Sequence, residues 1–287
     1  TVSGLAHLTA PSDQEALATV RKVLSYLPNN NVENPPFADT GDLVSRMDES
    51  LNQLVPMDPG VPYSMHNAIP YIVDSGSFLE LLGGFARNAI VGLARMGGMP
   101  VGIVSQEPDV MGGAIDIDAS DKICRFVRFC DAYNIPIVTF VDSPGFIPGT
   151  DQEYRGIIRH GAKVLYAYAE ASVPKISIVT RKAYGGAYVV MSSKYMGTDV
   201  TFAWPSAEIA VMGAEGAANI LHLGAKELRS LWRDPVMLVL IVHAFTFAIY
   251  TAATAMPERL SLASDGWSTW VLISTSSGCS PGTTISP

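Results

Sequence analysis

The order of apolar and polar positions predicts a chain of alternating helices and strands. Apolar residues at three- and four-residue spacing from Ser12 to Leu27 predict an amphipathic helix, and the polar run from Ser12 to Glu15 is typical of a helix start. A polar, proline-containing linker follows over residues 28–36. Prolines and a glycine interrupt residues 37–63, which predicts a short helix among loops.

From Ser64 onward the chain becomes richer in continuous apolar runs. A helix is expected around Ile69 to Val73, and the turn Met96 to Met99 between two apolar runs predicts a β-hairpin. Further elements are expected as a helix over 120–133, a strand over 136–142, a helix over 151–171 and a strand over 175–180. Strands that are apolar at successive positions imply a sheet covered on both faces. The pattern therefore predicts a layered α/β fold, in which ligands collect at the carboxyl ends of the strands.

Two glycine-rich loops follow predicted strands, over residues 144–149 and 184–187. A Gly-Gly-Ala turn between a strand and a helix lets free backbone N–H groups approach a ligand oxygen. The second loop is thus a candidate oxyanion hole, although a Gly-Gly pair before a helix is often only a tight connection. Neither a Ser/His/Asp nor a Cys/His set surrounds it, and the two loops are expected to outline one cleft.

Composition and charge narrow the function classes. Of 287 residues 48% are hydrophobic, the net charge is −8 and the isoelectric point is near 5.1. With no run of Lys or Arg to neutralise a phosphate backbone, we expect no nucleic-acid partner. Cys124, Cys130 and Cys279 have neither zinc spacing nor an even count, so we expect no metal and a reducing compartment. No signal peptide is recognised, and the missing initiator Met suggests a fragment.

Four long runs carry a resemblance to a known family: residues 125–149, 152–163, 181–188 and 203–213. They resemble the carboxyltransferase (β) subunit of biotin-dependent acyl-CoA carboxylases, a family that includes propionyl-CoA carboxylase β, methylmalonyl-CoA carboxyltransferase and the methylmalonyl-CoA decarboxylase α subunit. The resemblance covers about residues 1–221 and implies a crotonase-like (ClpP/crotonase) carboxyltransferase C-terminal domain.

The resemblance also implies a domain division. Residues 1–36 would be the end of the N-terminal half and a linker, residues 37–222 the C-terminal carboxyltransferase domain, and residues 223–287 a divergent apolar tail. The part that resembles a CoA-binding half is absent. Because the family builds its active site between halves of two subunits, this chain would hold half a site.

By the same resemblance, Gly186 and Ala187 are the predicted catalytic residues, as N–H donors to the biotin ureido carbonyl. Gly185 would permit the close approach. Tyr184 and Tyr188 would line a biotin slot, with a place in the core as the alternative. Pro144, Gly145 and Phe146 would shape the same cleft, and Val189 is a further predicted contact. Arg155 and His160 are expected in surface or interface contacts, and Glu208 as a cap near a helix start.

The implied reaction moves a carboxyl group between carboxybiotin and an acyl-CoA, with propionyl-CoA or methylmalonyl-CoA expected. Biotin would arrive on a biotin carboxyl carrier protein, with a biotin carboxylase subunit as a further partner and the chain in a homo-oligomer built from dimers. The family often has Asp where this chain has Val189, a position linked to acyl-chain selection. The expected location is the cytoplasm, or the mitochondrial matrix in a eukaryote.

Beyond His222 the sequence departs from the family pattern. Residues 236–256 form an uncharged apolar run that is long enough to span a bilayer, but a shifted reading frame is the preferred hypothesis. Two alternatives to the carboxylase stay open: the α subunit of a sodium-pumping methylmalonyl-CoA decarboxylase, and a noncatalytic truncated scaffold.

Overall fold

The computed structural model describes residues 1–233 and 236–251 of the chain. It divides into two units, Thr1–Ala214 and Glu215–Pro287, each of which is described by itself. The helices are α1 Asp13–Leu24, α2 Leu51–Leu54, α3 Met65–Ile72, α4 Ile117–Ala132, α5 Thr150–Arg155, α6 Ile157–Glu170, α7 Gly185–Val190 and α8 Ala214–Arg233, with 3-10 turns η1 Met111–Gly113 and η2 Lys194–Met196. The strands are β1 Leu79–Leu81, β2 Ala89–Met96, β3 Met99–Gln106, β4 Ile137–Ser143, β5 Lys175–Tyr184, β6 Val200–Ala203 and β7 Glu208–Ala210.

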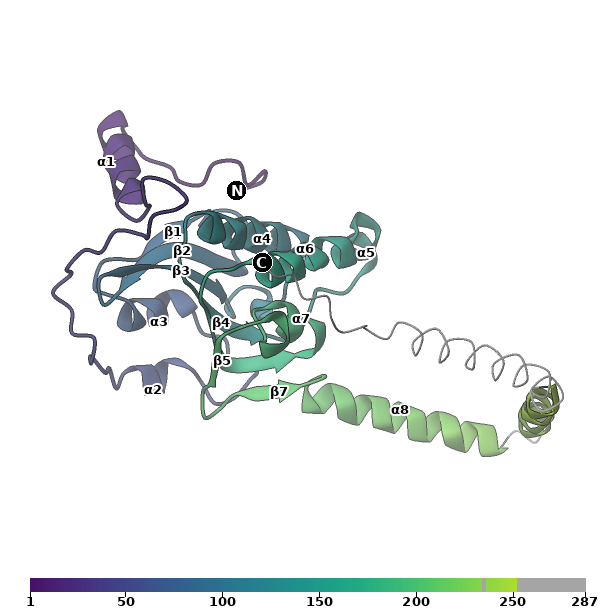
Figure 1. Cartoon of the computed structure of the whole chain (residues 1–287). Coiled ribbons are helices and arrows are strands. Elements are labelled where there is room, and N and C mark those ends of the chain that lie inside the picture. Colours follow the sequence, from purple (N-terminus) through teal and green to yellow (C-terminus); the bar gives the residue numbers. More distant parts are fainter. Residues whose placement is uncertain (234–235, 252–287) are drawn as a thin grey trace, which may run out of the picture. The chain divides into compact units, whose positions relative to one another are not determined.

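One mixed sheet organises the first unit (Figure 1). Its order is β1-β2-β3-β4-β5-β6, and β7 pairs with the last part of β5. The pairs β1/β2 and β2/β3 are antiparallel, and the pairs from β3 to β6 are parallel. The strands β3, β4 and β5 therefore end at the same edge of the sheet.

Apolar residues cover both faces of the sheet. On one face α4 and α6 pack over β2 to β5, with Phe126, Val164 and Tyr168 in the core. On the other face α3 and the segment before it contribute Val55, Tyr63 and other buried side chains. This arrangement confirms the predicted layered α/β fold, because the central strands β2 to β5 are buried on both sides.

Most predicted elements are confirmed, and the differences have local causes. The Ser12 side chain accepts a hydrogen bond from Glu15 N and caps α1, as the sequence predicts. The expected helix over 151–171 is wrong as one element: Gly156 adopts a left-handed φ of 87° and separates α5 from α6. Glu208 is not a helix cap, because it starts β7 and pairs with Lys182 of β5.

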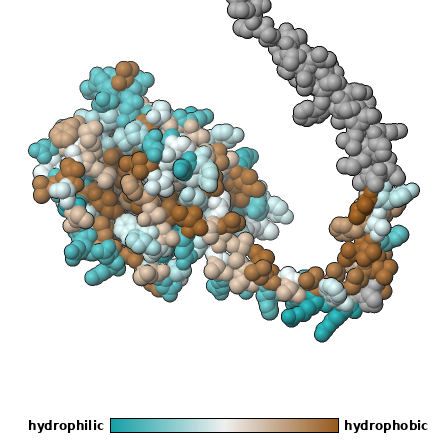
Figure 2. All heavy atoms as spheres, turned by 60° about the horizontal axis from the view of Figure 1, so that its bottom comes forward, coloured by the Kyte–Doolittle hydropathy of each residue, from teal (hydrophilic) through white to brown (hydrophobic). Residues whose placement is uncertain are grey.

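The second unit contains α8 and a further helix, Val236–Thr251. Figure 2 shows apolar side chains on the surface of this unit. Its exposed large apolar residues include Leu221, Trp232 and Phe245. Of the helices in the described residues, none alone has the length and apolar character to cross a bilayer; α8 and the next helix meet that criterion only together, as a bent pair. Most of the shifted-frame hypothesis falls on residues 252–287, outside the described residues.

Candidate functional site

The turn from β5 into α7 lies at the carboxyl end of the sheet (Figure 1). Its first residue, Gly185, has a left-handed φ of 56°, and a Cβ there would lie 3.0 Å from the carbonyl oxygen of Val211. A side chain is therefore excluded both by the backbone conformation and by the neighbouring chain. Glycine at this position allows β5 to pass directly into α7.

Gly186 and Ala187 lie in the first turn of α7, where backbone N–H groups have no partner within the helix. In the described residues no side chain caps this helix. Gly186 is exposed, whereas the methyl group of Ala187 is fully buried under the core. The arrangement leaves backbone donors as the polar groups of the turn.

The loop after β4 brings a second group of residues to the same edge. Phe146 forms an isolated bridge with Ile115, because Ile115 N donates to Gly145 O at 3.0 Å and Ile147 N donates to Ile115 O at 2.9 Å. Ser143 Oγ also accepts from Gly145 N at 3.3 Å. These bonds fix the backbone on both sides of the Phe146 ring.

A cavity of about 510 Å³ joins the two loops. From the loop after β4 and from α7 it is lined by Phe146, Gly186 and Val189, among others. The structure thus brings these three predicted residues together. Residues of α5 and α6 complete the wall: Glu153, Ile157, Ile158, Gly161, Ala162 and Leu165.

The α6 contribution was missed from the sequence. Its apolar positions recur every three or four residues, which indicates one helix face but does not say whether that face lines a cavity or fills a core. Gly161 is informative in the structure, since a Cβ there would lie 2.8 Å from two ring atoms of Phe146. The missing side chain of Gly161 is what lets the ring lie against α6.

The other predicted contacts take different positions. Tyr184 is buried and its hydroxyl donates to Glu208 Oε2, so that burial and then this carboxylate raise the pKa of Tyr184 to about 12. Tyr188 packs partly buried against the core. In the described part of the chain, neither tyrosine lines the cavity of about 510 Å³, nor do Pro144, Gly145, Gly185 and Ala187. Their roles at a biotin slot stay predictions.

Arg155 and His160 lie outside this cavity and make polar contacts. Arg155 pairs with Asp151 at 3.4 Å on α5, and His160 Nδ1 lies 3.0 Å from Asp121 Oδ2 of α4. These contacts agree with the surface role expected from the sequence.

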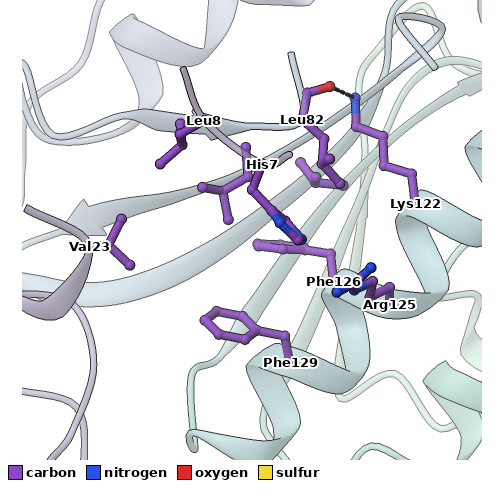
Figure 3. Close-up of a pocket in the computed structure, with 10 residues that line it drawn as sticks. His7, Leu8, Val23, Leu82, Lys122, Arg125, Phe126 and Phe129 are labelled. Atoms are coloured by element: carbon purple, nitrogen blue, oxygen red, sulfur yellow. Dashed lines mark hydrogen bonds between the residues drawn. The ribbon is translucent and has the colours of Figure 1, made fainter. Parts of the chain in front are cut away.

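A second cavity, of about 300 Å³, lies between the N-terminal segment and α4 (Figure 3). His7 and Phe126 project into it, whereas the Lys122 ammonium turns to the carbonyl oxygens of Leu82, Phe85, Ala86 and Ala89 at 2.6–3.3 Å. The Lys122 ammonium therefore holds the loop before β2 together.

Comparison with known proteins identifies the family to which the chain belongs. Residues 1–234 match the family described as the carboxyl transferase domain. The chain belongs to this family. The match continues beyond His222 to the end of α8, and it confirms the resemblance found in the sequence.

Individual relatives of this carboxyl transferase domain agree. The propionyl-CoA carboxylase carboxyltransferase subunit of Haloferax mediterranei is 54% identical over 220 residues, covering 77% of this chain and 43% of the relative. The methylmalonyl-CoA decarboxylase subunit alpha of Veillonella parvula is 55% identical over the same shares. The chain spans less than half the length of these curated relatives.

A solved structure supports the fold of the carboxyl transferase domain. The transcarboxylase 12S hexamer, determined with hydrolysed methylmalonyl-coenzyme A bound, superposes with a TM-score of 0.74 at 52% identity. The alignment covers 77% of this chain and 44% of the transcarboxylase chain. The fold is thus crotonase-like, as expected from the sequence.

Proposed function

We propose that this chain supplies the biotin-side half of the active site of a biotin-dependent acyl-CoA carboxyltransferase. The observation that carries the proposal is the turn at Gly185, after which Gly186, in the first turn of α7, lines the cavity of about 510 Å³. Gly186 and Ala187 are the proposed donors to a developing negative charge on oxygen. Preorganised donors of this kind typically contribute about 3–4 kcal/mol each to the transition state.

The cavity suits a bicyclic, mostly apolar group with one polar end. Phe146 and Val189 would contact the apolar part, and the N–H groups of Gly186 and Ala187 would hold the ureido carbonyl oxygen. When bound, carboxybiotin supplies the carboxyl group that is transferred. The chain's own contribution is to orient the ring system, to exclude water through the apolar wall and to donate from the backbone.

The relatives support an acyl-CoA substrate and an oligomeric assembly. Propionyl-CoA and methylmalonyl-CoA are the proposed substrates, since relatives at 54–55% identity are named for these acyl groups. The transcarboxylase hexamer supports a homo-oligomer. We further propose a biotin carboxyl carrier protein and a biotin carboxylase subunit as partners, and the cytoplasm or mitochondrial matrix as the location.

The test is carboxyl transfer from a carboxylated carrier protein to propionyl-CoA. It would be measured with this chain alone and with the chain supplemented by the N-terminal half of a family member. Transfer only in the supplemented sample is expected. A folded chain that gives no transfer in either sample would contradict the proposal and favour a noncatalytic scaffold.

A matched pair at Gly186 tests the donor itself. A Cβ at Gly186 would meet no atom within 4 Å, so Gly186→Ala keeps both the fold and the N–H group. Gly186→Pro removes the N–H group within the first turn of α7, where no hydrogen bond inside the helix uses it. We expect Gly186→Pro to lower kcat about 100-fold or more and Gly186→Ala to lower it far less.

A second candidate function is decarboxylation within a sodium pump. It is favoured by the 55% identity to the methylmalonyl-CoA decarboxylase subunit alpha of Veillonella parvula. The same turn and cavity would serve that reaction. Release of CO₂ from methylmalonyl-CoA that depends on a membrane partner, without net carboxylation of propionyl-CoA, would favour it.

A further inference from the structure

β5 contains a bulge shortly before the Gly185 turn. β4 and β5 pair regularly up to Val141 and Val179, but the next pair is Ser143 with Ala183. Between these pairs β4 advances by two residues and β5 by four, so β5 carries two extra residues. A bulge bends its strand and redirects the residues that follow. Here the residues that follow are Tyr184 and the turn.

The side chain of Asp142, opposite the bulge, holds its backbone. Asp142 is buried; its Oδ2 accepts from Arg181 Nε at 3.0 Å and its Oδ1 accepts from Lys182 N at 3.1 Å. Thr180 Oγ1 donates to Val141 O at 3.1 Å. Each of the three residues of the bulge therefore has a hydrogen bond to β4.

Arg181 connects the same bulge to the segment before α3. Its Nη1 donates to the carbonyl oxygens of Asp58 and Val61 at 2.8 and 2.7 Å. The guanidinium lies 4.8 Å from the centre of the Tyr63 ring, and the Tyr63 hydroxyl donates to Thr180 Oγ1 at 3.2 Å. Arg181 is itself almost fully buried. Contacts on both sides of the sheet edge thus fix the bulge in one conformation.

From these contacts we infer that Asp142 and Arg181 are positioning residues that set the direction of the Gly186 and Ala187 N–H groups. Asp142 does not line the cavity, and both its oxygens are engaged, so it acts through the backbone of the turn. The segment from Lys182 to Tyr184 transmits the position, since β7 pairs along it and Gly185 comes next. The catalytic consequence, but not the positioning, rests on the proposed function.

Three variants separate positioning from fold stability. Asp142→Asn has the same shape and keeps an acceptor for Lys182 N, but it removes the charge that faces Arg181. Thr180→Val is a milder change at the bulge that keeps the side-chain shape. Lys175→Met is the control at the other end of β5, where Lys175 Nζ donates to the carbonyl oxygens of Tyr168 and Ala171 at 3.1 and 2.5 Å.

The experiment measures amide chemical shifts and residual dipolar couplings of Gly186 and Ala187 in the full chain. It also measures kcat and KM in the sample completed with an N-terminal half. We expect Asp142→Asn and Thr180→Val to change the N–H orientations and to lower kcat about tenfold or more with KM nearly unchanged, because small misplacements of catalytic groups are costly. Lys175→Met should destabilise the chain without either effect.

Unchanged N–H orientations in Thr180→Val and in folded Asp142→Asn would overturn the inference, whatever the loss of stability. If Asp142→Asn does not fold, Thr180→Val alone decides. A further result would separate the two proposals. If the variants change the N–H orientations but the unmodified chain transfers no carboxyl group in the completed sample, the positioning role stands and the proposed function is contradicted.

Discussion

The packing of Phe146 against Gly161 predicts a change that alters binding more than stability. In Gly161→Ala the new methyl group would lie 2.8 Å from Cε1 and Cζ of the Phe146 ring, closer than carbon atoms approach without strain. The backbone around Phe146 is held by its bridge to Ile115, so the ring has to turn. It lines the cavity of about 510 Å³, and turning it reshapes that cavity.

Two opposing terms set the stability change. Replacing glycine by alanine inside a helix favours the folded state by about 1 kcal/mol. Overpacking a filled site costs about 1–3 kcal/mol. The cost falls at the lower end here, because the clashing atoms are the far end of one half-buried side chain. We expect the free energy of unfolding to stay within about 1 kcal/mol of the unmodified chain.

Gly161→Ala should change the binding of the biotin donor more than the stability of the chain. Loss of about half the apolar contact of a phenylalanine side chain weakens a bound ring system by about 1.4 kcal/mol. That corresponds to about a tenfold higher KM for the biotin donor. The assay is carboxyl transfer in the completed sample, with urea unfolding of the same variant. Phe146→Leu removes the ring atoms that clash with the new methyl group. In a chain that carries Phe146→Leu, adding Gly161→Ala should therefore not raise KM further.

An unchanged KM together with normal stability in Gly161→Ala would contradict a perturbed Phe146 ring. The same contradiction would arise if Gly161→Ala raised KM by an equal factor in a chain that already carries Phe146→Leu. In that case Gly161 would act without the ring.

Three further changes test the described contacts. His66 Nδ1 lies 2.6 Å from Glu107 Oε2, and hydrogen bonds to this and a second carboxylate raise the pKa of His66 to about 9. The resulting stabilisation of the folded state is complete below the unfolded pKa near 6.5 and is lost as the pH rises through about 9. Because the imidazole is partly exposed, we expect it to contribute only about 1 kcal/mol to the free energy of unfolding. Urea unfolding at several pH values measures this contribution, which should be absent in His66→Gln. Gly102→Ala would place a Cβ 2.5 Å from Cys130 Sγ and should lower the free energy of unfolding by about 1–3 kcal/mol. The loss should be smaller in a chain that also carries Cys130→Ala. Equal losses with and without Cys130→Ala would contradict the clash. Lys122→Met leaves four carbonyl oxygens without their cation and should lower the free energy of unfolding by about 3 kcal/mol; a loss below about 1 kcal/mol would contradict this account of the loop.

The sequence predicted those parts of the fold that depend on local pattern. The hairpin turn at Met96 to Met99 and the capped start of α1 follow from neighbouring residues, and the structure has both. The break at Gly156 was missed because an isolated glycine within a helical pattern does not by itself end a helix. The strand predicted over 175–180 extends to Tyr184, since pairing with β7 and β4 supports residues that no local pattern marks.

The sequence was enough to predict which two loops form the candidate site. It was not enough to predict the geometry of those loops. Both loops follow apolar strands, so their meeting at one sheet edge follows from parallel pairing. Gly186 and Phe146 do line one cavity. The bulge beside Asp142 depends on partners 39 and 40 residues away in sequence, and no spacing rule connects them.

Charged side chains at the carboxyl edge of the sheet are turned toward backbone and toward one another. Asp142 and Arg181 form a buried pair, in which burial raises the pKa of the Asp142 carboxyl and the guanidinium opposes that rise. Lys182 Nζ reaches the carbonyl oxygen of Pro59 at 3.3 Å, and Glu208 accepts from Tyr184. Within the described residues, only one ionisable side chain lines the cavity, the exposed Glu153. A buried ion pair contributes little net stability compared with apolar packing, and its best attested use is to select one conformation. The contacts at this edge of the sheet accordingly hold a backbone turn in place, which is what the proposed role of the N–H donors requires.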